Sequence, residues 1–333
     1  MKTDDMELDL TIVTPVYNTP VKFLDDYLES VLKIQGITYE AIMVSDGSTD
    51  KDTLEWLKRV DKEHETIRVI LREENCGISV CRNIAIKTGR GRYILTVDSD
   101  DMTIASELPP LVRYADKTKA DLMIAGFKTV GISNREFTVD RTRPLVSAMR
   151  IQTGGWLIRR GFLIENDVLY PEGKYLEDVT FILGNITKAG KISYSRRILG
   201  INRTHEASTS HQSVYQHMRE DQIPFKELER FLSDFDGTSC RYAPDIYGFA
   251  VQILAGIACL FSAHSTPYEK ERISGKAADL MRRYVKHRKL NALLYIIKGS
   301  GNLLADVLPF VYAVALDLRC EKLLEKTVGR MLK

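Results

Sequence analysis

Residues 93–101 read Tyr93-Ile94-Leu95-Thr96-Val97-Asp98-Ser99-Asp100-Asp101, an apolar run that ends in three carboxylates within four residues. The run Tyr93 to Val97 has the length and composition of a buried strand, so the carboxylates follow its carboxyl end. Carboxylates this close repel one another and need a counter-charge, most simply a hard divalent cation. A solvated acidic turn, in which Asp101 or Ser106 caps the next helix, is the alternative. This segment alone leaves both interpretations open, a metal-bridged phosphate site and an acidic turn.

An alternation of strands and helices extends on both sides of this segment. Apolar runs predict buried strands at residues 10–16, 41–44, 69–71, 93–97 and 122–125. Apolar residues at helical spacing predict helices at residues 21–34, 51–63, 77–88 and 106–119. Strands that alternate with helices imply crossover connections, and therefore an α/β fold with a mostly parallel, doubly wound sheet. Ligands of such sheets bind beyond the carboxyl ends of the strands.

The second half of the chain has a different pattern. Residues 131–210 are less regular, with a predicted helix that begins near Glu177 and short strands at 191–195 and 198–201. From about residue 212 the pattern is helical to the end. We therefore predict an α/β domain over residues 1–211 and a helical C-terminal region over residues 212–333.

Composition limits the class of protein. The chain has 333 residues, 44% hydrophobic and 28% charged, as in an ordinary globular protein. The net charge of +2 gives no reason to expect a nucleic acid partner. Five cysteines without a CxxC pair suggest reduced thiols, and the acidic first residues lack the apolar core of a signal peptide, so we expect a cytoplasmic protein.

The uncharged stretch Ile246 to Tyr268 is long enough to span a bilayer, but it is interrupted by polar residues. We expect a buried helix near Ile246 to Ala263 instead.

Two polar segments follow predicted strands at the carboxyl edge of the sheet. Asp46 comes directly after a strand, and Gly47 permits an unusual backbone turn before the next helix. The spacing fits a capped turn, with or without a role for Asp46 as an acceptor for a nucleobase N–H. Gly77 opens the helix that carries Arg82, which either meets a diphosphate or a neighbouring carboxylate, or lies on the surface of an amphipathic helix.

Two further segments carry candidate chemistry. Glu177 and Asp178 lie at a predicted helix start, where acids favour the helix dipole; one of them in a cleft can act as a general base. Residues 202–210 are a polar loop, which is either solvated or closes over a bound substrate and brings Arg203 and His205 near phosphate or metal.

Taken in order, these segments resemble the family 2 glycosyltransferases of GT-A fold. The matching stretches are residues 11–18, 45–50, 75–83, 98–101 and 177–178, so the resemblance covers about residues 8–210. It implies that residues 1–211 are a GT-A catalytic domain that binds a nucleotide diphosphate sugar, with a UDP-sugar expected. It also implies transfer of the sugar, with inversion, to a hydroxyl of a glycan, polysaccharide or lipid-linked acceptor of the cell envelope.

The resemblance implies roles for single residues as well. The matching nucleotide-sugar positions are Pro15, Tyr17, Asn18, Asp46, Gly47, Asn75, Gly77, Arg82, Asp98, Ser99 and Asp100. Asp98 and Asp100 match the pair that binds Mn²⁺ or Mg²⁺, and Asp101 shares or replaces one contact. Asp178 matches the general base, and Glu177 is its acidic neighbour.

The chain departs from the family pattern at two positions. Ser45 stands where the family often has Asp, which could alter base selectivity. Cys81 stands where it often has Ala, which we interpret as a packing variation.

Other classes fit less well. A sugar nucleotidyltransferase typically has a Gly-rich, basic phosphate loop after the first strand, whereas residues 14–18 contain no Gly, Lys or Arg. A dinucleotide-dependent oxidoreductase would need a GxGxxG that is missing here. A catalytically silent sugar-nucleotide or partner-binding module remains open, although the chain retains both acidic segments.

The sequence of the helical C-terminal region leaves open which partner it contacts. Residues 282–289 are basic and precede the apolar residues 293–297. This pattern suits a peripheral contact with the inner face of the cytoplasmic membrane, near lipid-linked acceptors. It equally suits a solvated helix face, and a homodimer built through the tail is a further alternative.

Overall fold

The computed structural model describes residues 7–139, 153–204, 219–238, 240, 242–261, 265–297 and 303–331. The chain divides into two compact units. The N-terminal unit comprises Met1–Gly173 and Ala189–His205, and the C-terminal unit comprises Lys174–Lys188 and Glu206–Lys333. The predicted boundary near residue 212 differs from this division because helix α7 (Glu177–Lys188) packs against helices α8 and α9 of the C-terminal unit.

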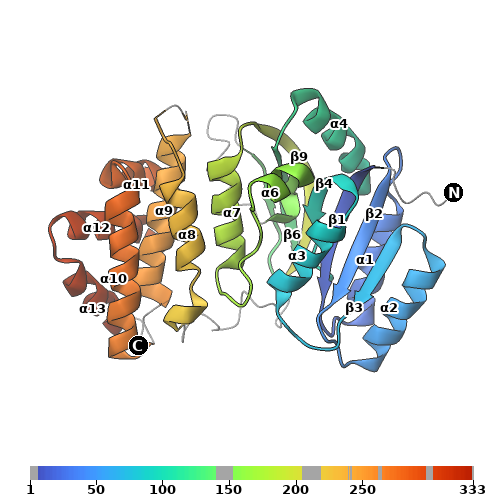
Figure 1. The fold of residues 1–333 in the computed structure, drawn as a ribbon, viewed down its shortest axis with the longest axis horizontal. Coiled ribbons are helices and arrows are strands. Elements are labelled where there is room, and N and C mark those ends of the chain that lie inside the picture. Colours follow the sequence, from blue (N-terminus) through green and yellow to red (C-terminus); the bar gives the residue numbers. More distant parts are fainter. Residues whose placement is uncertain are drawn as a thin grey trace. The chain divides into compact units, whose positions relative to one another are not determined.

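The N-terminal unit is a sheet with helices on its faces (Figure 1). Its strands are β1 (Leu8–Val16), β2 (Tyr39–Ser45), β3 (Ile67–Leu71), β4 (Gly91–Thr96), β5 (Met102–Thr103), β6 (Leu122–Gly131), β7 (Arg135–Phe137), β8 (Trp156–Arg159) and β9 (Ile192–Thr204). Its α-helices are α1 (Val21–Leu32), α2 (Lys51–Glu63), α3 (Ile78–Thr88), α4 (Leu108–Thr118) and α6 (Arg160–Glu165), with 3₁₀ turns η1 (Ala105–Glu107) and η2 (Thr153–Gly155).

The described strands form one mixed sheet in the order β3-β2-β1-β4-β8-β6-β9-β5, with β7 paired to β6. Strands β3, β2, β1 and β4 are parallel, as predicted. Beyond them β8 runs antiparallel to both of its neighbours, and β5 runs antiparallel to β9. The α/β class is confirmed, but the sheet is mixed rather than mostly parallel, because β7 and β8 arise from the irregular residues after 131.

Strand register places the predicted chemistry at one edge of the sheet. Val16 at the end of β1 pairs with Ser45 at the end of β2, and Val13 of β1 pairs with Thr96 at the end of β4. Residues 17–18, 46–47 and 98–101 therefore leave the sheet on the same side, beyond the carboxyl ends of neighbouring strands.

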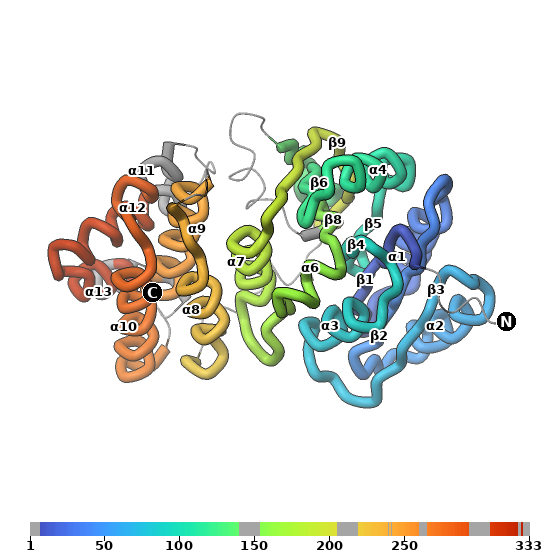
Figure 2. Tube along the Cα trace, turned by 45° about the horizontal axis from the view of Figure 1, so that its top comes forward, coloured from blue at the N-terminus to red at the C-terminus, as the bar shows by residue number. Residues whose placement is uncertain are grey.

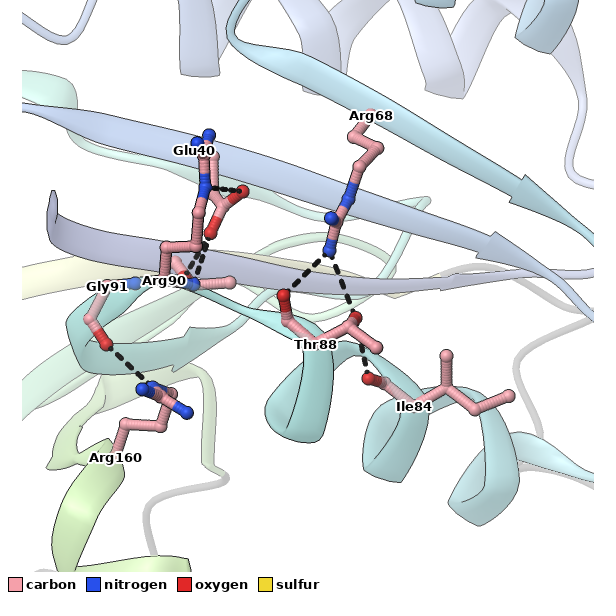
Figure 3. A network of polar contacts seen from close by, with 8 residues as sticks. Glu40, Arg68, Ile84, Thr88, Arg90, Gly91 and Arg160 are labelled. Atoms are coloured by element: carbon pink, nitrogen blue, oxygen red, sulfur yellow. Dashed lines mark hydrogen bonds and ion pairs between the residues drawn. The ribbon is translucent and has the colours of Figure 1, made fainter. Parts of the chain in front are cut away.

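A polar network lies at the opposite, amino-terminal edge (Figure 3). The carboxylate of Glu40, which is 3% exposed, accepts the Thr11 hydroxyl at 3.0 Å and the Arg90 backbone N–H at 2.5 Å. Arg68 donates to the hydroxyl and the carbonyl of Thr88, and Arg160 donates to the carbonyl of Gly91. These bonds connect β1 and β2 to the residue before β4, β3 to α3, and α6 to the start of β4.

The C-terminal unit is helical in its described residues (Figure 2). It contains α7, the 3₁₀ turn η5 (Glu220–Gln222), α8 (Phe225–Ser233), α9 (Ala243–Gly256), the π-helix η6 (Ile257–Phe261), α10 (Pro267–Tyr284), α11 (Arg288–Ile297), α12 (Leu303–Asp317) and α13 (Glu321–Met331). The buried helix predicted near Ile246 corresponds to α9 and η6. Over the described ranges, every helix is too short or too polar to cross a membrane.

The basic run at residues 282–289 is largely neutralised within this unit. Four of its cations pair with neighbouring acids: Arg282 with Glu321, Arg283 with Glu229 and Asp279, and Arg288 and Lys289 with Asp317.

Candidate active site

Asp46 and Gly47 hold the segment that leads into α3. The Asp46 carboxylate, 4% exposed, accepts the backbone N–H groups of Cys76 at 2.8 Å and Gly77 at 2.9 Å. Gly47 adopts φ +66°, and a Cβ there would lie 2.5 Å from the backbone nitrogen of Asn75. The Cys81 thiol also hydrogen-bonds this carboxylate, and the role of Asp46 toward a nucleobase stays a prediction.

Asn18 holds the loop between β2 and α2. Its Oδ1 accepts the backbone N–H groups of Thr49 at 2.8 Å and Asp50 at 2.9 Å, and its own backbone has φ +48°. Asp50 in turn caps α2 by accepting the Thr53 N–H, and the predicted capped turn is present. The segments at residues 17–18 and 45–50 are therefore hydrogen-bonded to each other at the carboxyl edge of the sheet.

The predicted nucleoside residues differ in accessibility. Tyr17 is 54% exposed, so its ring face is available to a ligand, whereas Pro15 is buried in β1. Ser45 is fully buried and donates to the Ser48 hydroxyl at 3.0 Å. Ser45 thus stabilises the loop between β2 and α2 through its hydrogen bond to Ser48.

Arg82 lies inside the protein, and the surface alternative is wrong. It is 2% exposed and donates to Asp98 Oδ1 at 2.9 Å. Its guanidinium carbon lies 4.9 Å from the centre of the Tyr170 ring. The predicted contact with a neighbouring carboxylate is present, and the contact with a diphosphate stays a prediction. Tyr170 was not among the residues predicted for the site.

The acidic segment 98–101 presents its carboxylates in different directions. The Asp98 side chain is 40% exposed, whereas Asp101 is 9% exposed and accepts the Arg203 backbone N–H at 2.7 Å. Burial, followed by the charges of Asp98 and Asp100, raises the pKa of Asp101 well above its usual value. Ser99 shares a 2.7 Å hydrogen bond with the Thr19 hydroxyl and so ties this segment to the loop after β1.

The donor set fits a divalent cation that takes most of its ligands from a bound diphosphate. Within the described ranges, His, Cys, Asp and Glu side chains do not gather in groups of three that could hold a metal. Mg²⁺ and similar cations usually need only one or two carboxylates, with water and substrate phosphates as the other ligands. The exposed Asp98 and the half-buried Asp100 are suited to this arrangement. Asp101 already holds a backbone N–H.

Arg203 does not lie in a loop, so that part of the prediction is wrong. Strand β9 continues to Thr204, and Arg203 is one of its last residues. Its guanidinium donates to the Asp100 carbonyl at 3.0 Å and to Asp26 at 2.7 Å, which fixes the acidic segment against α1. His205, the other residue of the predicted closing loop, lies outside the described residues.

Glu177 and Asp178 occupy the first turn of α7, as predicted, and belong to the C-terminal unit. Both are half-buried. The roles of Asp178 as general base and Glu177 as its neighbour stay predictions.

A residue that the sequence analysis missed is Arg72, directly after β3. Its Nη1 is buried without a hydrogen-bond partner among the described residues, and its charge acts on Cys81. Burial and the nearby Asp46 nevertheless raise the pKa of Cys81 to about 12. A cation that follows a strand at the ligand edge was the available signal.

Comparison with known proteins agrees with this geometry. The family model described as glycosyl transferase family 2 matches residues 11–178, about half of the chain. The chain is 33% identical over 200 residues to poly(ribitol-phosphate) beta-glucosyltransferase of Bacillus spizizenii, covering 56% of this chain and 31% of that protein. It is 39% identical over 118 residues to the putative teichuronic acid biosynthesis glycosyltransferase TuaG of Bacillus subtilis, covering 35% of this chain and 46% of that protein. The matches thus span less than half of either relative.

Among solved structures, the chain is similar to S. aureus TarS 1-349 in complex with UDP-GlcNAc. The TM-score is 0.71 at 21% identity, over 97% of this chain and 92% of that one. This similarity confirms the predicted fold class, a GT-A α/β domain with C-terminal helices. Together with the family match over the residues that build the carboxyl edge of the sheet, it leads to one conclusion: the chain belongs to glycosyl transferase family 2.

Proposed function

We propose that the protein transfers a sugar from a UDP-sugar to a hydroxyl group of a cell-envelope polymer, with inversion at the anomeric carbon. The observation that carries the proposal is the grouping of two hydrogen-bonded pairs, Asp46 with Gly77 and Arg82 with Asp98, at the carboxyl edge of the sheet within one unit. This is the edge at which α/β sheets bind their ligands.

The side chains at that edge suit the nucleoside part of a UDP-sugar donor. Tyr17 offers an exposed ring for stacking against a base, and Asp46 is the proposed acceptor for a nucleobase N–H. The related TarS is described in complex with UDP-GlcNAc, which supports a uridine nucleotide. Asn75 and Gly77 lie beside Asp46 and complete this side of the site.

The diphosphate end involves Arg82 and the acidic segment. Asp98 and Asp100 would hold Mn²⁺ or Mg²⁺, which as a Lewis acid stabilises negative charge on the departing diphosphate. Arg82 places a guanidinium beside Asp98 and can donate to phosphate oxygens in a fork geometry.

Proton transfer is assigned to α7. Asp178 takes the proton of the attacking hydroxyl, with Glu177 as its acidic neighbour, and inversion then needs no covalent intermediate. This assignment comes from the family motif. In the structure both residues lie in the first turn of α7.

The acceptor is proposed from the names of the relatives. They are described as a poly(ribitol-phosphate) beta-glucosyltransferase and a putative teichuronic acid biosynthesis glycosyltransferase, so we propose an anionic, hydroxyl-bearing polymer as the acceptor. All five cysteines are free thiols, which suits transfer in the reducing cytoplasm. A lipid-linked acceptor, a peripheral membrane contact and a homodimer are alternatives.

A ligand screen followed by a transfer assay tests the proposal. UDP with Mn²⁺ should raise the melting temperature more than GDP or TDP with Mn²⁺, and chelation by EDTA should remove most of the effect. With UDP-glucose or UDP-GlcNAc and poly(ribitol-phosphate), Asp178→Asn should lower the rate at least about 100-fold, while its affinity for UDP stays unchanged.

Glu177→Gln is the matched control and should retain more of the rate than Asp178→Asn. Failure of every nucleotide to stabilise the protein would contradict the proposal. UDP binding without donor hydrolysis or transfer would instead identify a silent binding module.

A further inference from the structure

We propose that Tyr170, held in place by Asn83, is a positioning residue that sets the Arg82 guanidinium against Asp98 at the diphosphate end of the donor site. The inference rests on the proposed function for its consequence, but its geometry stands on contacts within the N-terminal unit. Tyr170 matches none of the motif positions that define the family resemblance.

The first contact is between Arg82 and the aromatic ring. Arginine is a long side chain with several rotamers, so a buried guanidinium needs partners on more than one side to adopt one position. The Arg82 guanidinium lies 4.9 Å from the Tyr170 ring centre, and its Nη2 donates to Asp98 at 2.9 Å. The ring thus supports the face of the group whose edge binds the carboxylate.

The second contact fixes Tyr170 itself. The Asn83 side chain, 3% exposed, accepts the Tyr170 backbone N–H at 2.9 Å and donates to the Tyr170 carbonyl at 2.8 Å. It also donates to Glu172 at 3.0 Å. One amide therefore binds both backbone polar groups of a residue 87 positions along the chain.

The third contact ties the ring to the sheet. The Tyr170 hydroxyl lies 3.4 Å from Oγ1 of Thr96, the last residue of β4. Thr96 stands two residues before Asp98. The backbone of Tyr170 is therefore held by Asn83 of α3, and its hydroxyl lies beside Thr96 of β4. Arg82 and Asn83 are successive residues of α3, and this one helical turn supplies both the positioned cation and the amide that holds its support.

The arrangement has a consequence for donor binding. A diphosphate that enters beside Asp98 brings negative charge toward the acidic segment, and a fixed Arg82 adds its positive charge to that of the proposed cation. Without the ring, Arg82 gains alternative rotamers. The entropy cost of ordering the Arg82 side chain when the nucleotide binds then offsets part of its favourable interaction with the diphosphate. The loss should affect nucleotide affinity rather than proton transfer.

Isothermal titration with UDP and Mn²⁺ tests the consequence in three variants. Tyr170→Leu, which removes the aromatic face, should weaken UDP binding about tenfold. Tyr170→Phe, which keeps the face and removes only the long hydroxyl contact, should stay within about threefold of wild type. Phe162→Leu, at another aromatic residue that is 2% exposed, controls for general destabilisation and should leave the affinity unchanged.

Equal affinity of folded Tyr170→Leu and wild type would overturn the inference, as would an equal loss in Tyr170→Phe and Tyr170→Leu. In a transfer assay the loss in Tyr170→Leu should appear in the KM for the UDP-sugar, with kcat nearly retained.

Crystal structures of wild type and Tyr170→Leu without nucleotide test the geometry independently. The inference expects the contact between Arg82 and Asp98 to be broken or disordered in the variant, and an unchanged contact would overturn it. If wild type binds no UDP, the proposed function fails, and these two structures still decide whether Tyr170 positions Arg82.

Discussion

Several motif residues at the candidate site bind the protein's own backbone. Asp46 holds the N–H groups of Cys76 and Gly77, and Asn18 holds those of Thr49 and Asp50. Such bonds satisfy donors at the start of α2 and α3 and fix the loops that a nucleotide would touch. The motif therefore specifies the shape of the ligand edge as well as its chemistry.

Gly47→Ala tests this shaping role. An added Cβ would lie 2.5 Å from Asn75 N and 2.6 Å from the carbonyl carbon of Glu74, and φ is +66°. We expect the free energy of unfolding to fall by about 3 kcal/mol from backbone strain and overlap, as measured by urea denaturation. UDP affinity should fall at least about tenfold, because the segment held by Asp46 moves.

Gly36→Ala is the matched control. Gly36 also has positive φ (+79°), but a Cβ there meets nothing within 4 Å. Gly36→Ala should lower the free energy of unfolding by only about 1 kcal/mol and leave UDP affinity unchanged. Equal effects of the two substitutions would mean that the contact with residues 74–75 is unimportant.

At the scale of elements, strand β2 connects the two edges of the sheet. Its start carries Glu40, which binds Thr11 and Arg90, and its end leads to Asp46. Rigid strands with both ends bonded hold the loops at the ligand edge in register.

Glu40→Ala should lower the free energy of unfolding by about 2–4 kcal/mol, because it leaves the Thr11 hydroxyl and the Arg90 N–H without their acceptor. Glu40 lies about 20 Å along β2 from Asp46, so UDP affinity of the folded variant should not change. Glu40→Gln, which keeps a neutral acceptor, should cost less. Chemical denaturation and calorimetry measure both quantities, and a loss of UDP affinity in Glu40→Ala would contradict the separation of the two edges.

Helices α12 and α13 contain a buried carboxyl group with a predictable pH dependence. Glu325, 6% exposed, accepts the Tyr312 hydroxyl at 3.0 Å. Burial raises the pKa of Glu325 above its usual 4.5. Between 4.5 and the raised pKa the folded protein binds more protons at this site than the unfolded chain, so its contribution to stability falls as pH rises through this window.

Glu325→Gln removes this titration. The melting temperature of the variant should equal that of wild type below pH 4.5 and exceed it increasingly as pH rises through the window. The difference between the two proteins isolates Glu325, because other titrating groups are common to both. A difference that does not vary with pH would contradict the assignment.

Strands β1 to β4 and helices α1 to α4 could be predicted to within about two or three residues at most boundaries, because local apolar periodicity and caps such as Asp50 determine them, whereas β5 was not predicted. Strands β7 and β8 could not, since they form through pairing with β6, which local sequence does not record. The same applies to Tyr170, whose partner Asn83 is 87 residues away. Motif spacing located Asp98 and Arg82 and predicted a carboxylate as one partner of Arg82, but it did not identify Asp98 as that carboxylate.

At the scale of the whole molecule, the change in sequence pattern near residue 212 is not the boundary between the two units. Helix α7 belongs to the C-terminal unit, where Gly184 packs so closely that a Cβ would lie 2.6 Å from the Phe231 ring of α8. That partner lies 47 residues further along the chain, so composition could not reveal it. The family match accordingly runs through the N-terminal unit and ends in the first turn of α7.

A crystal structure of the wild-type protein with UDP and Mn²⁺ tests the central claim most directly. The claim predicts the uracil against Tyr17 and Asp46, and the diphosphate between Arg82 and a manganese ion held by Asp98 and Asp100. Nucleotide bound elsewhere, or an empty carboxyl edge at saturating UDP and Mn²⁺, would contradict it.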